Sequence, residues 1–330
     1  MNQVELAFFL IVIAGFLQGT FGIFIKNVAP LKWENFWAIF SFISYLLAPV
    51  IFAFVQVQNL FPILFSLPFD SVILPLIFGC LWGIGSVIFG LCVIRIGVSL
   101  TYSIVLGLVT LLGAILPIFI NNITFAPQAL AFLIIGLSIV PIGVFISGYA
   151  GVIKEKKLNP KNKASIAGIL LAVISGIFSS FLNVGFVFGK DISLHAQKMG
   201  VAEIDASALV LLVVVFGGFV TNFGYALYLM FKNNTVRVYK KLQAKIFFSI
   251  LTASLFWFGS VALFGVNSIK LGSLGPSVGW AILFSLSIVI SNVWGIKFGE
   301  WKGVAKALLL QFTALGLIIV GVVFIALSAL

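Results

Sequence analysis

The charged residues of this chain stand far apart, and the stretches between them are almost entirely apolar. A helix needs about 20 apolar residues to cross a bilayer core about 30 Å thick, so each stretch of that length predicts a spanning helix. The stretches are Glu5–Lys26, Glu34–Asp70, Asp70–Arg95, Arg95–Lys154, Lys163–Lys190, Asp205–Lys232, Lys245–Lys270, Lys270–Lys297 and Lys306 to the C-terminus. The fourth is long enough for two helices, which we expect to break at Asn121, Asn122 and Pro127. The pattern predicts an all-α membrane protein with ten transmembrane helices.

Two of the apolar stretches resemble each other. Residues 82–97 read WGIGSVIFGLCVIRIG and residues 257–272 read WFGSVALFGVNSIKLG, with five identities and a matched basic residue at a constant offset. A weaker match joins VIAGF at 12–16 with VISGI at 173–177. These matches predict a repeat of five helices, and an odd number of spans turns the second copy upside down in the membrane.

The repeat divides the chain into three parts. We expect an N-terminal five-helix repeat over residues 1–153, a cytoplasmic linker over 154–163, and a C-terminal five-helix repeat over 164–330. The linker sequence KEKKLNPKNK carries five lysines and a proline. The predicted fold is therefore two inverted five-helix repeats.

Composition and charge support the membrane class and predict an orientation. Apolar residues make up 62% of the 330 positions and charged residues only 8%, and the mean hydropathy is +1.27. A net charge of +11 could indicate a nucleic-acid partner, but sixteen of the nineteen Lys and Arg residues fall in alternate loops. The positive-inside rule places those loops in the cytoplasm, in contact with anionic lipid, and both termini outside. We expect a multi-pass protein of the inner (plasma) membrane with no nucleic-acid partner.

Inverted repeats are typical of transporters that bind substrate near the bilayer midplane and work by alternating access. Trp82 and Trp257 fall near the middle of their predicted helices, although Trp usually prefers the headgroup region. An indole can stack on the apolar face of a sugar ring. We therefore expect the two indoles to face each other across a hydrated pocket and bind substrate; packing in the core is the alternative.

Neutral polar side chains lie at a similar predicted depth and are the other candidate substrate ligands: Gln18, Asn183, Asn222 and Ser260. Groups of this kind should face protein or a wet cavity, because lipid offers them no hydrogen bonds. Amides supply both donors and acceptors, as a neutral polyol requires. The alternative for each is a hydrogen bond between helices.

Charged residues are absent from the middle of every predicted span, where a charge usually indicates ion or proton handling. The candidates for proton coupling are therefore Glu5, Asp70 and Glu300 at helix ends, where solvated termini are the alternative. The sequence shows no metal-ligand cluster and no arrangement of nucleophile, base and acid. We expect no metal, no cofactor and no enzymatic activity.

Several segments, in order along nearly the whole chain, resemble the L-rhamnose/proton symporter family of the drug/metabolite transporter superfamily. They are KWENFW (32–37), FGCLWGIGSVIFGLCVIRIGVSL (78–100), AGVIKEKK (150–157), LLAVISGIFSS (170–180), NFGY (222–225), FWFG (256–259) and GEW (299–301). The resemblance implies sugar import driven by protons, with a central cavity lined by both repeats. It also carries Trp82, Asn222, Trp257 and Trp280 across as substrate-binding positions.

We therefore predict a secondary transporter for a small neutral solute, most readily a monosaccharide such as L-rhamnose or a related sugar. Two alternatives remain open at this level. The chain could be an amino-acid or drug/metabolite exporter of the same superfamily, or a membrane sensor or scaffold that transports nothing.

Overall fold

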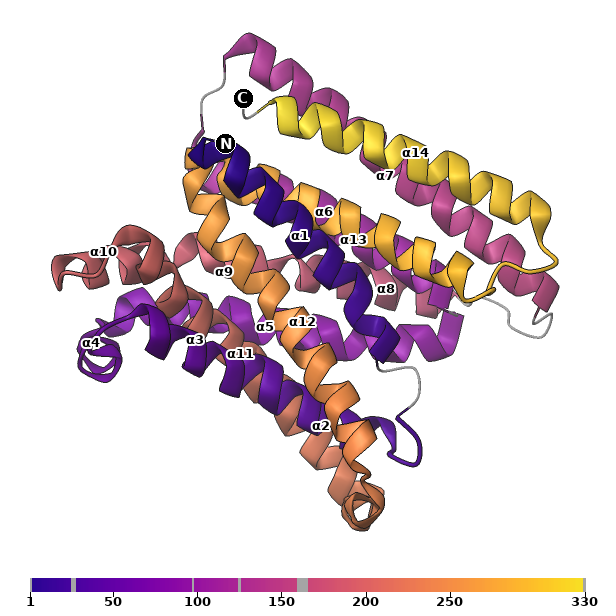
Figure 1. Cartoon of the computed structure of the whole chain (residues 1–330), viewed down its shortest axis with the longest axis horizontal. Helices are drawn as coiled ribbons and strands as arrows, with labels where there is room; N and C mark the ends of the chain where they lie inside the picture. The colour runs from indigo at the N-terminus through magenta and orange to yellow at the C-terminus, as the bar shows by residue number, and fades with distance from the viewer. Residues whose placement is uncertain (1, 25–27, 97, 124–125, 159–165, 329–330) are drawn as a thin grey trace.

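The computed structural model describes residues 2–24, 28–96, 98–123, 126–158 and 166–328 (Figure 1). Among them, nine helical segments are long and apolar enough to cross a membrane, and a shorter apolar helix covers Ile104–Ile120. The nine are Gln3–Phe24, Trp33–Gln56, Phe69–Cys92, Pro127–Lys154, Ile166–Lys198, Glu203–Lys232, Ala244–Lys270, Gly272–Lys297 and Ala305–Leu327. The chain is therefore a multi-pass helical membrane protein.

The secondary structure of the described residues is helical throughout. The first half contains α1 (Gln3–Phe24), α2 (Trp33–Phe42), η1 (Ile43–Leu47), α3 (Ala48–Gln56), α4 (Leu60–Ser66), α5 (Phe69–Ile96), α6 (Val98–Ile120) and α7 (Pro127–Leu158). The second half contains α8 (Ile166–Ser179), α9 (Phe181–Phe188), α10 (Lys190–Lys198), α11 (Glu203–Lys232), η2 (Val236–Lys241), α12 (Ala244–Lys270), η3 (Gly272–Leu274), α13 (Gly275–Lys297) and α14 (Ala305–Leu327).

The charged residues mark the helix ends as the sequence predicts. Helix α5 has Asp70 in its first turn and Arg95 in its last, and α12 and α13 end at Lys270 and Lys297. The predicted break in the long uncharged stretch is confirmed, because α6 ends just before Asn121 and α7 begins at Pro127. Helix α7 runs to Leu158, so the first residues of the predicted linker are helical; residues 159–163 of that linker lie outside the described residues.

Two of the spans are interrupted, which the sequence analysis does not predict. The second span changes from α-helix to a π-helical turn at Ile43–Leu47 and back. Pro49 has no N–H to donate to the Tyr45 carbonyl. The N–H of Ala48 donates to the carbonyl of Ile43, five residues earlier, and this bond makes the turn wider than an α-helical one.

The span of the second half that begins at Ile166 breaks at Ser180 and again at Gly189, giving α8, α9 and α10.

The helices form two groups (Figure 1). Helices α7 and α14 pack along each other at one edge of the molecule. In the main group, α1 packs on α12 and α13, α8 packs on α5 and α6, and α11 packs on α5 and α2. The α5–α11 approach is close enough that a Cβ on Gly79 would collide with the backbone carbonyl of Val214. These contacts enclose a space between α1, α2, α5, α6, α12 and α13.

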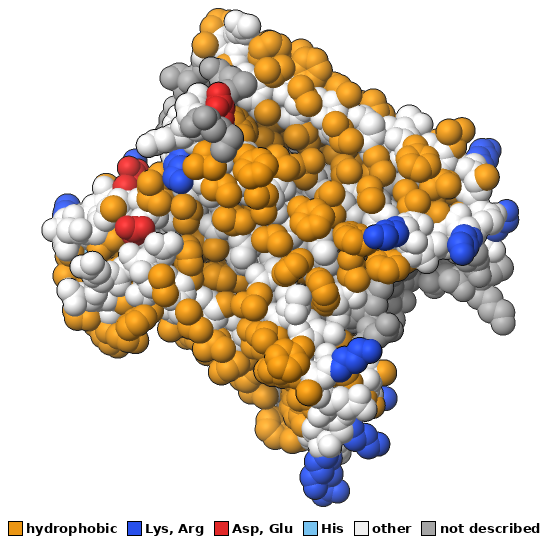
Figure 2. Space-filling view, in the orientation of Figure 1, with side chains coloured by type: hydrophobic (Ala, Val, Ile, Leu, Met, Phe, Trp, Pro, Cys, Tyr) orange, Lys and Arg blue, Asp and Glu red, His pale blue; other side chains and the backbone are white. Residues whose placement is uncertain are grey.

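Charge divides the molecule into two ends (Figure 2). Most Lys and Arg side chains visible in this view lie toward the right and the bottom, and the visible Asp and Glu side chains lie toward the left, in part near the N-terminus and in part near α10. Apolar side chains cover the surface between. We call the end that carries Lys154, Lys297 and Lys302 the basic end, and the opposite end, where both termini lie, the far end.

Candidate functional site

A cavity of about 160 Å³ lies among the helices of the main group, and we call it the central cavity. Its wall is mostly aromatic and aliphatic, with a few hydroxyl and amide groups. The lining residues are Gln18, Phe21, Trp37, Phe40, Tyr45, Trp82, Ser86, Phe89, Tyr102, Val105, Leu106, Val109, Ser179, Leu182, Trp257, Val261, Phe284, Ser287 and Ser291. The volume is below the roughly 300–1,000 Å³ of sites for drug-sized ligands, so the cavity suits a small solute.

Three aromatic rings form one side of this cavity. Trp82 of α5 and Trp257 of α12 stack on each other, with ring centroids 5.5 Å apart and planes at 19°. Tyr45 places its edge against both, at 5.1 Å from Trp82 and 4.7 Å from Trp257. The sequence predicts that the two indoles face each other across a pocket. The structure brings them together, but in direct contact, with no pocket between the two rings.

The third ring, that of Tyr45, comes from the π-helical turn. Tyr45 lies within Ile43–Leu47, where the wider turn precedes Pro49. Its side chain is buried at 2% exposure. π-Helical turns inside α-helices occur frequently at functional sites. A proline four residues after the tyrosine is the sequence signal that could have identified this residue.

Gln18 supplies the clearest polar group for a ligand. It lies on α1 and lines the central cavity, and its buried Oε1 atom has no hydrogen-bond partner among the described residues. A buried acceptor without a partner costs about 1–3 kcal/mol, which a ligand donor would recover. The hydroxyls of Ser86, Ser179 and Ser287 line the same cavity. The arrangement offers an acceptor and several hydroxyls beside an aromatic wall.

Asn222 lies behind the cavity wall and is not among the cavity-lining residues. Its Nδ2 donates to the carbonyls of Gly83 at 3.3 Å and Gly218 at 2.8 Å. Its Oδ1 accepts from Trp37 Nε1 at 2.9 Å and from Ser86 Oγ at 2.6 Å. The amide therefore holds two lining residues, Trp37 and Ser86, in position; its direct contact with substrate stays a prediction.

The other three predicted substrate residues are also buried away from the central cavity. The Ser260 hydroxyl is buried on α12 and has no partner among the described residues. Asn183 of α9 donates from Nδ2 to the carbonyls of Gly113 at 2.7 Å and Pro276 at 2.9 Å. Trp280 of α13 donates from Nε1 to the carbonyl of Val109 at 2.9 Å. In this conformation none of them lines the central cavity, and their contact with substrate stays a prediction.

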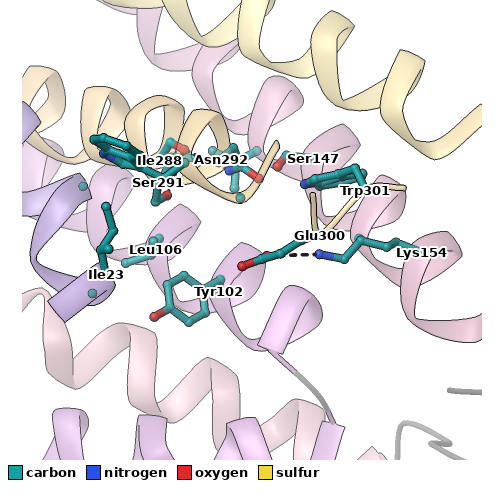
Figure 3. A pocket seen from close by; sticks show the side chains of 16 residues that line it. Ile23, Tyr102, Leu106, Ser147, Lys154, Ile288, Ser291, Asn292, Glu300 and Trp301 are labelled. Atoms are coloured by element: carbon teal, nitrogen blue, oxygen red, sulfur yellow. Dashed lines mark hydrogen bonds and ion pairs between the residues drawn. The ribbon is translucent and has the colours of Figure 1, made fainter. Parts of the chain in front are cut away.

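A second cavity, of about 210 Å³, opens at the basic end, and we call it the vestibule (Figure 3). It meets the central cavity at Tyr102, Leu106 and Ser291, which line both. Its polar wall includes Ser147, Asn292, Lys154 and Glu300, and Figure 3 shows Glu300 pointing toward Tyr102. The two cavities therefore lie next to each other between the centre of the molecule and the basic end.

Glu300 and Lys154 form an ion pair at the mouth of the vestibule. The Nζ of Lys154 lies 3.7 Å from Oε2 of Glu300 and 4.6 Å from the centre of the Trp301 ring. This pair joins the C-terminal part of α7 to the loop between α13 and α14. The other two predicted coupling residues, Glu5 and Asp70, are exposed in the first turns of α1 and α5.

A third cavity, of about 580 Å³, opens at the far end, and we call it the far cavity. Asn121, Lys190, Glu203 and Pro276 are among its lining residues. Within the described part of the chain, it shares no lining residue with the central cavity. Among the lining residues described, the central cavity therefore shares part of its wall with the vestibule and none with the far cavity.

A buried carboxylate that no sequence pattern indicates supports the cavity wall from behind. Glu34, in the first turn of α2, is 6% exposed and accepts hydrogen bonds from Asn233 Nδ2 at 3.1 Å and Thr235 Oγ1 at 3.0 Å. Asn35 donates to the carbonyl of Thr235, and Tyr239 donates to the carbonyl of Asn35. This cluster fastens the start of α2, which carries the cavity residues Trp37 and Phe40, to the loop after α11.

Comparison with known proteins places the chain in a family of sugar symporters. The family described as L-rhamnose-proton symport protein (RhaT) matches residues 1–329. The chain is 22% identical over 293 residues to the L-rhamnose-proton symporter of Pectobacterium atrosepticum, covering 85% of each chain. It is 24% identical over 289 residues to the L-rhamnose-proton symporter of Yersinia pestis (strain Pestoides F), covering 84% of each. The chain therefore belongs to the L-rhamnose-proton symport protein family.

Proposed function

We propose that this chain is a sugar/proton symporter that binds L-rhamnose or a related monosaccharide in the central cavity and moves it by alternating access. The observation that carries the proposal is the unpartnered Oε1 of Gln18 beside the Trp82–Trp257 stack. The family match and the relatives named as L-rhamnose-proton symporters support it.

The cavity chemistry supports a deoxy sugar in particular. A sugar ring has an apolar face that stacks on an aromatic ring, and its hydroxyls need both donors and acceptors. The Trp82–Trp257 stack offers the aromatic surface, and Gln18 with the serine hydroxyls offers hydrogen-bond donors and acceptors. Rhamnose has a methyl group where a hexose has a hydroxymethyl group, and aliphatic wall residues such as Val105 and Val261 suit that methyl.

We propose that the fold is two inverted repeats of five spans, with α6 as the tenth span, as in the drug/metabolite transporter superfamily. The packing supports this. The first helix of each half, α1 or α8, packs on the third and fourth spans of the other half. The last spans, α7 and α14, pack on each other, as do the fourth spans, α6 and α13. Each of these contacts made by a helix of one half therefore has an equivalent contact made by the corresponding helix of the other half.

The site residues support the same repeat. The long sequence match aligns Trp82 with Trp257, and the two indoles stack on each other. The short match aligns Gln18 with Ser179, and both line the central cavity. Equivalent positions of the two halves therefore meet at one site, as alternating access between inverted repeats requires.

We propose that the basic end faces the cytoplasm and that both termini lie outside. The positive-inside rule supports this orientation, since the loops rich in Lys and Arg gather at the basic end. The vestibule is then the inner opening, and the far cavity the outer one. The conformation described is the one that exchanges sugar with the cytoplasm.

We propose Glu300 as the carboxylate that carries the coupled proton. Glu300 lines the vestibule, which meets the central cavity. The other two predicted coupling residues, Glu5 and Asp70, are exposed at the far end. The Nζ of Lys154 lies 3.7 Å from Oε2 of Glu300. The vestibule would give Glu300 access to the cytoplasm, where it would release the coupled proton.

Counterflow in proteoliposomes tests the function. Vesicles loaded with unlabelled L-rhamnose should accumulate labelled L-rhamnose, and an inward proton gradient should drive net uptake. Exchange of amino acids or apolar drugs in place of sugars would instead support an exporter. Absence of exchange and of ligand-induced thermal stabilisation across deoxyhexoses, hexoses, pentoses and amino acids would support a sensor or scaffold.

A further inference from the structure

A continuous packed layer separates the central cavity from the far cavity. Phe284 lines the central cavity, and its ring contacts Trp280 at 4.5 Å between centroids. Trp280 contacts Phe264 at 5.3 Å, and Phe264 contacts Phe186 at 5.9 Å. Phe186 lines the far cavity. The row of four rings thus runs from one cavity wall to the other.

Hydrogen bonds between helices hold this layer closed. Asn183 Nδ2 donates to the carbonyls of Gly113 and Pro276, which joins α9 to α6 and to the start of α13. The indole N–H of Trp280 donates to Val109, which joins α13 to α6 a second time. Val109 lines the central cavity and Pro276 lines the far cavity, so the hydrogen bonds span the same layer as the rings.

Gly113 makes the arrangement possible. A Cβ at this position would collide with the indole nitrogen of Trp280, and its carbonyl accepts the shorter hydrogen bond from Asn183. Both side chains are buried, with Trp280 at 1% exposure and Asn183 at 0%. One residue of α6 therefore supports both members of the layer.

We propose that Asn183 and Trp280, seated on Gly113, form the outer barrier of the transport cycle. The barrier closes the far end while sugar exchanges through the vestibule, and it opens when α9 and the start of α13 separate from α6. This inference rests on the proposed transport function and orientation. It gives Asn183 and Trp280 a role in closing the pathway, without contact with sugar in this conformation.

Labelling of a cysteine inside the layer tests the barrier without knowledge of the substrate. Ser277 follows Pro276, is 0% exposed and has an unpartnered hydroxyl among the described residues. A Ser277→Cys reporter is introduced into the full chain with Cys80→Ser and Cys92→Ser. A membrane-impermeant maleimide is then added from outside to cells. We expect slow labelling when the barrier residues are intact.

Two substitutions should open the barrier by different routes. Asn183→Leu keeps the number and branching of the side-chain heavy atoms but removes both donated hydrogen bonds, and Gly113→Ala displaces the Trp280 indole. Each should raise the external labelling rate at least tenfold. The matched control is Gly316→Ala on α14, where an added Cβ meets no atom within 4 Å, and it should leave the rate unchanged.

The outcomes separate the barrier from the proposed function. Unchanged labelling in folded Asn183→Leu and Gly113→Ala, or faster labelling only from the cytoplasmic side, would overturn the barrier. Loss of sugar binding in Asn183→Leu with unchanged labelling would do the same and favour a substrate contact. If either variant fails to fold, Trp280→Phe, which loses only the N–H and one ring, provides the same test. Faster labelling in a protein that exchanges no sugar would uphold the barrier and refute the transport assignment alone.

Discussion

The indole of Trp82 lies against that of Trp257, with 5.5 Å between ring centroids and 19° between ring planes, although 175 positions separate them in the chain. One ring comes from each half of the molecule, and Tyr45 contacts both. The stack is a contact between the halves as well as a wall of the central cavity. A movement of one half against the other must therefore change the wall of the central cavity.

Trp257→Ala should reduce counterflow by about tenfold or more while the folded yield is retained. Removal of the ring takes away the stacking surface, and tenfold corresponds to about 1.4 kcal/mol, close to the contribution of one aromatic pair. Counterflow per folded protein and the size-exclusion profile measure the two effects. Phe312→Ala on the exposed face of α14 is the control. Loss of folded protein in Trp257→Ala would return this residue to a packing role.

Gln18→Leu should raise the half-saturation concentration for sugar by roughly 2-fold to 12-fold, because one hydrogen bond contributes about 0.5–1.5 kcal/mol. Concentration-dependent counterflow gives the value. Gln311→Leu is the matched control, since that buried amide exchanges hydrogen bonds with Ser147. The control should lower the melting temperature and leave the half-saturation concentration unchanged. An unaltered value for Gln18→Leu would exclude a ligand contact.

Glu300→Gln should uncouple sugar movement from protons. The amide does not gain or lose a proton as a carboxyl group does, so counterflow should persist while uptake driven by a proton gradient falls to the level of equilibration. Uptake against pH in proteoliposomes makes the comparison. Asp70→Asn and Glu5→Gln are the controls, and both should keep coupled uptake. Coupled uptake by Glu300→Gln at the original rate would assign the proton to another group.

Glu34→Ala should lower the stability of the folded protein by about 1–3 kcal/mol, because Asn233 and Thr235 lose their buried acceptor. A thermal-shift measurement in detergent should show a lower melting temperature for Glu34→Ala. Asp191→Ala removes an exposed carboxylate in the first turn of α10 and serves as the control. Equal melting temperatures for the two variants would contradict the role of Glu34 in fastening α2.

Local patterns predicted much of the fold and part of the site. The positions of Asp70, Arg95, Lys270 and Lys297 mark helix ends because a charge in hydrocarbon is costly. The sequence repeat predicts that Trp82 and Trp257 face each other across a pocket; the structure brings them into direct contact. The first prediction needs only the spacing of charged residues along the chain. The second needs only a comparison of the two halves of the sequence.

The remaining features depend on neighbours that no local pattern specifies. Asn183 and Asn222 look alike in sequence, because each is a single amide in an apolar helix. The backbone carbonyls near each side chain determine its hydrogen bonds. The Asn222 amide is occupied by Gly83, Gly218, Trp37 and Ser86. The carbonyl oxygen of Gln18 is left without a partner, and only the packing of α1 against α12 and α13 reveals this.

The wide turn at Ile43–Leu47 has a mechanical consequence. A π-helical turn holds one residue more than an α-helical turn, and one residue of an α-helix corresponds to about 100° of rotation. The turn therefore sets the rotation of the segment Trp33–Phe42 about its axis relative to α3. A Pro49→Ala substitution that restored ordinary α-helix would change which side chains of this segment, among them Trp37 and Phe40, line the central cavity.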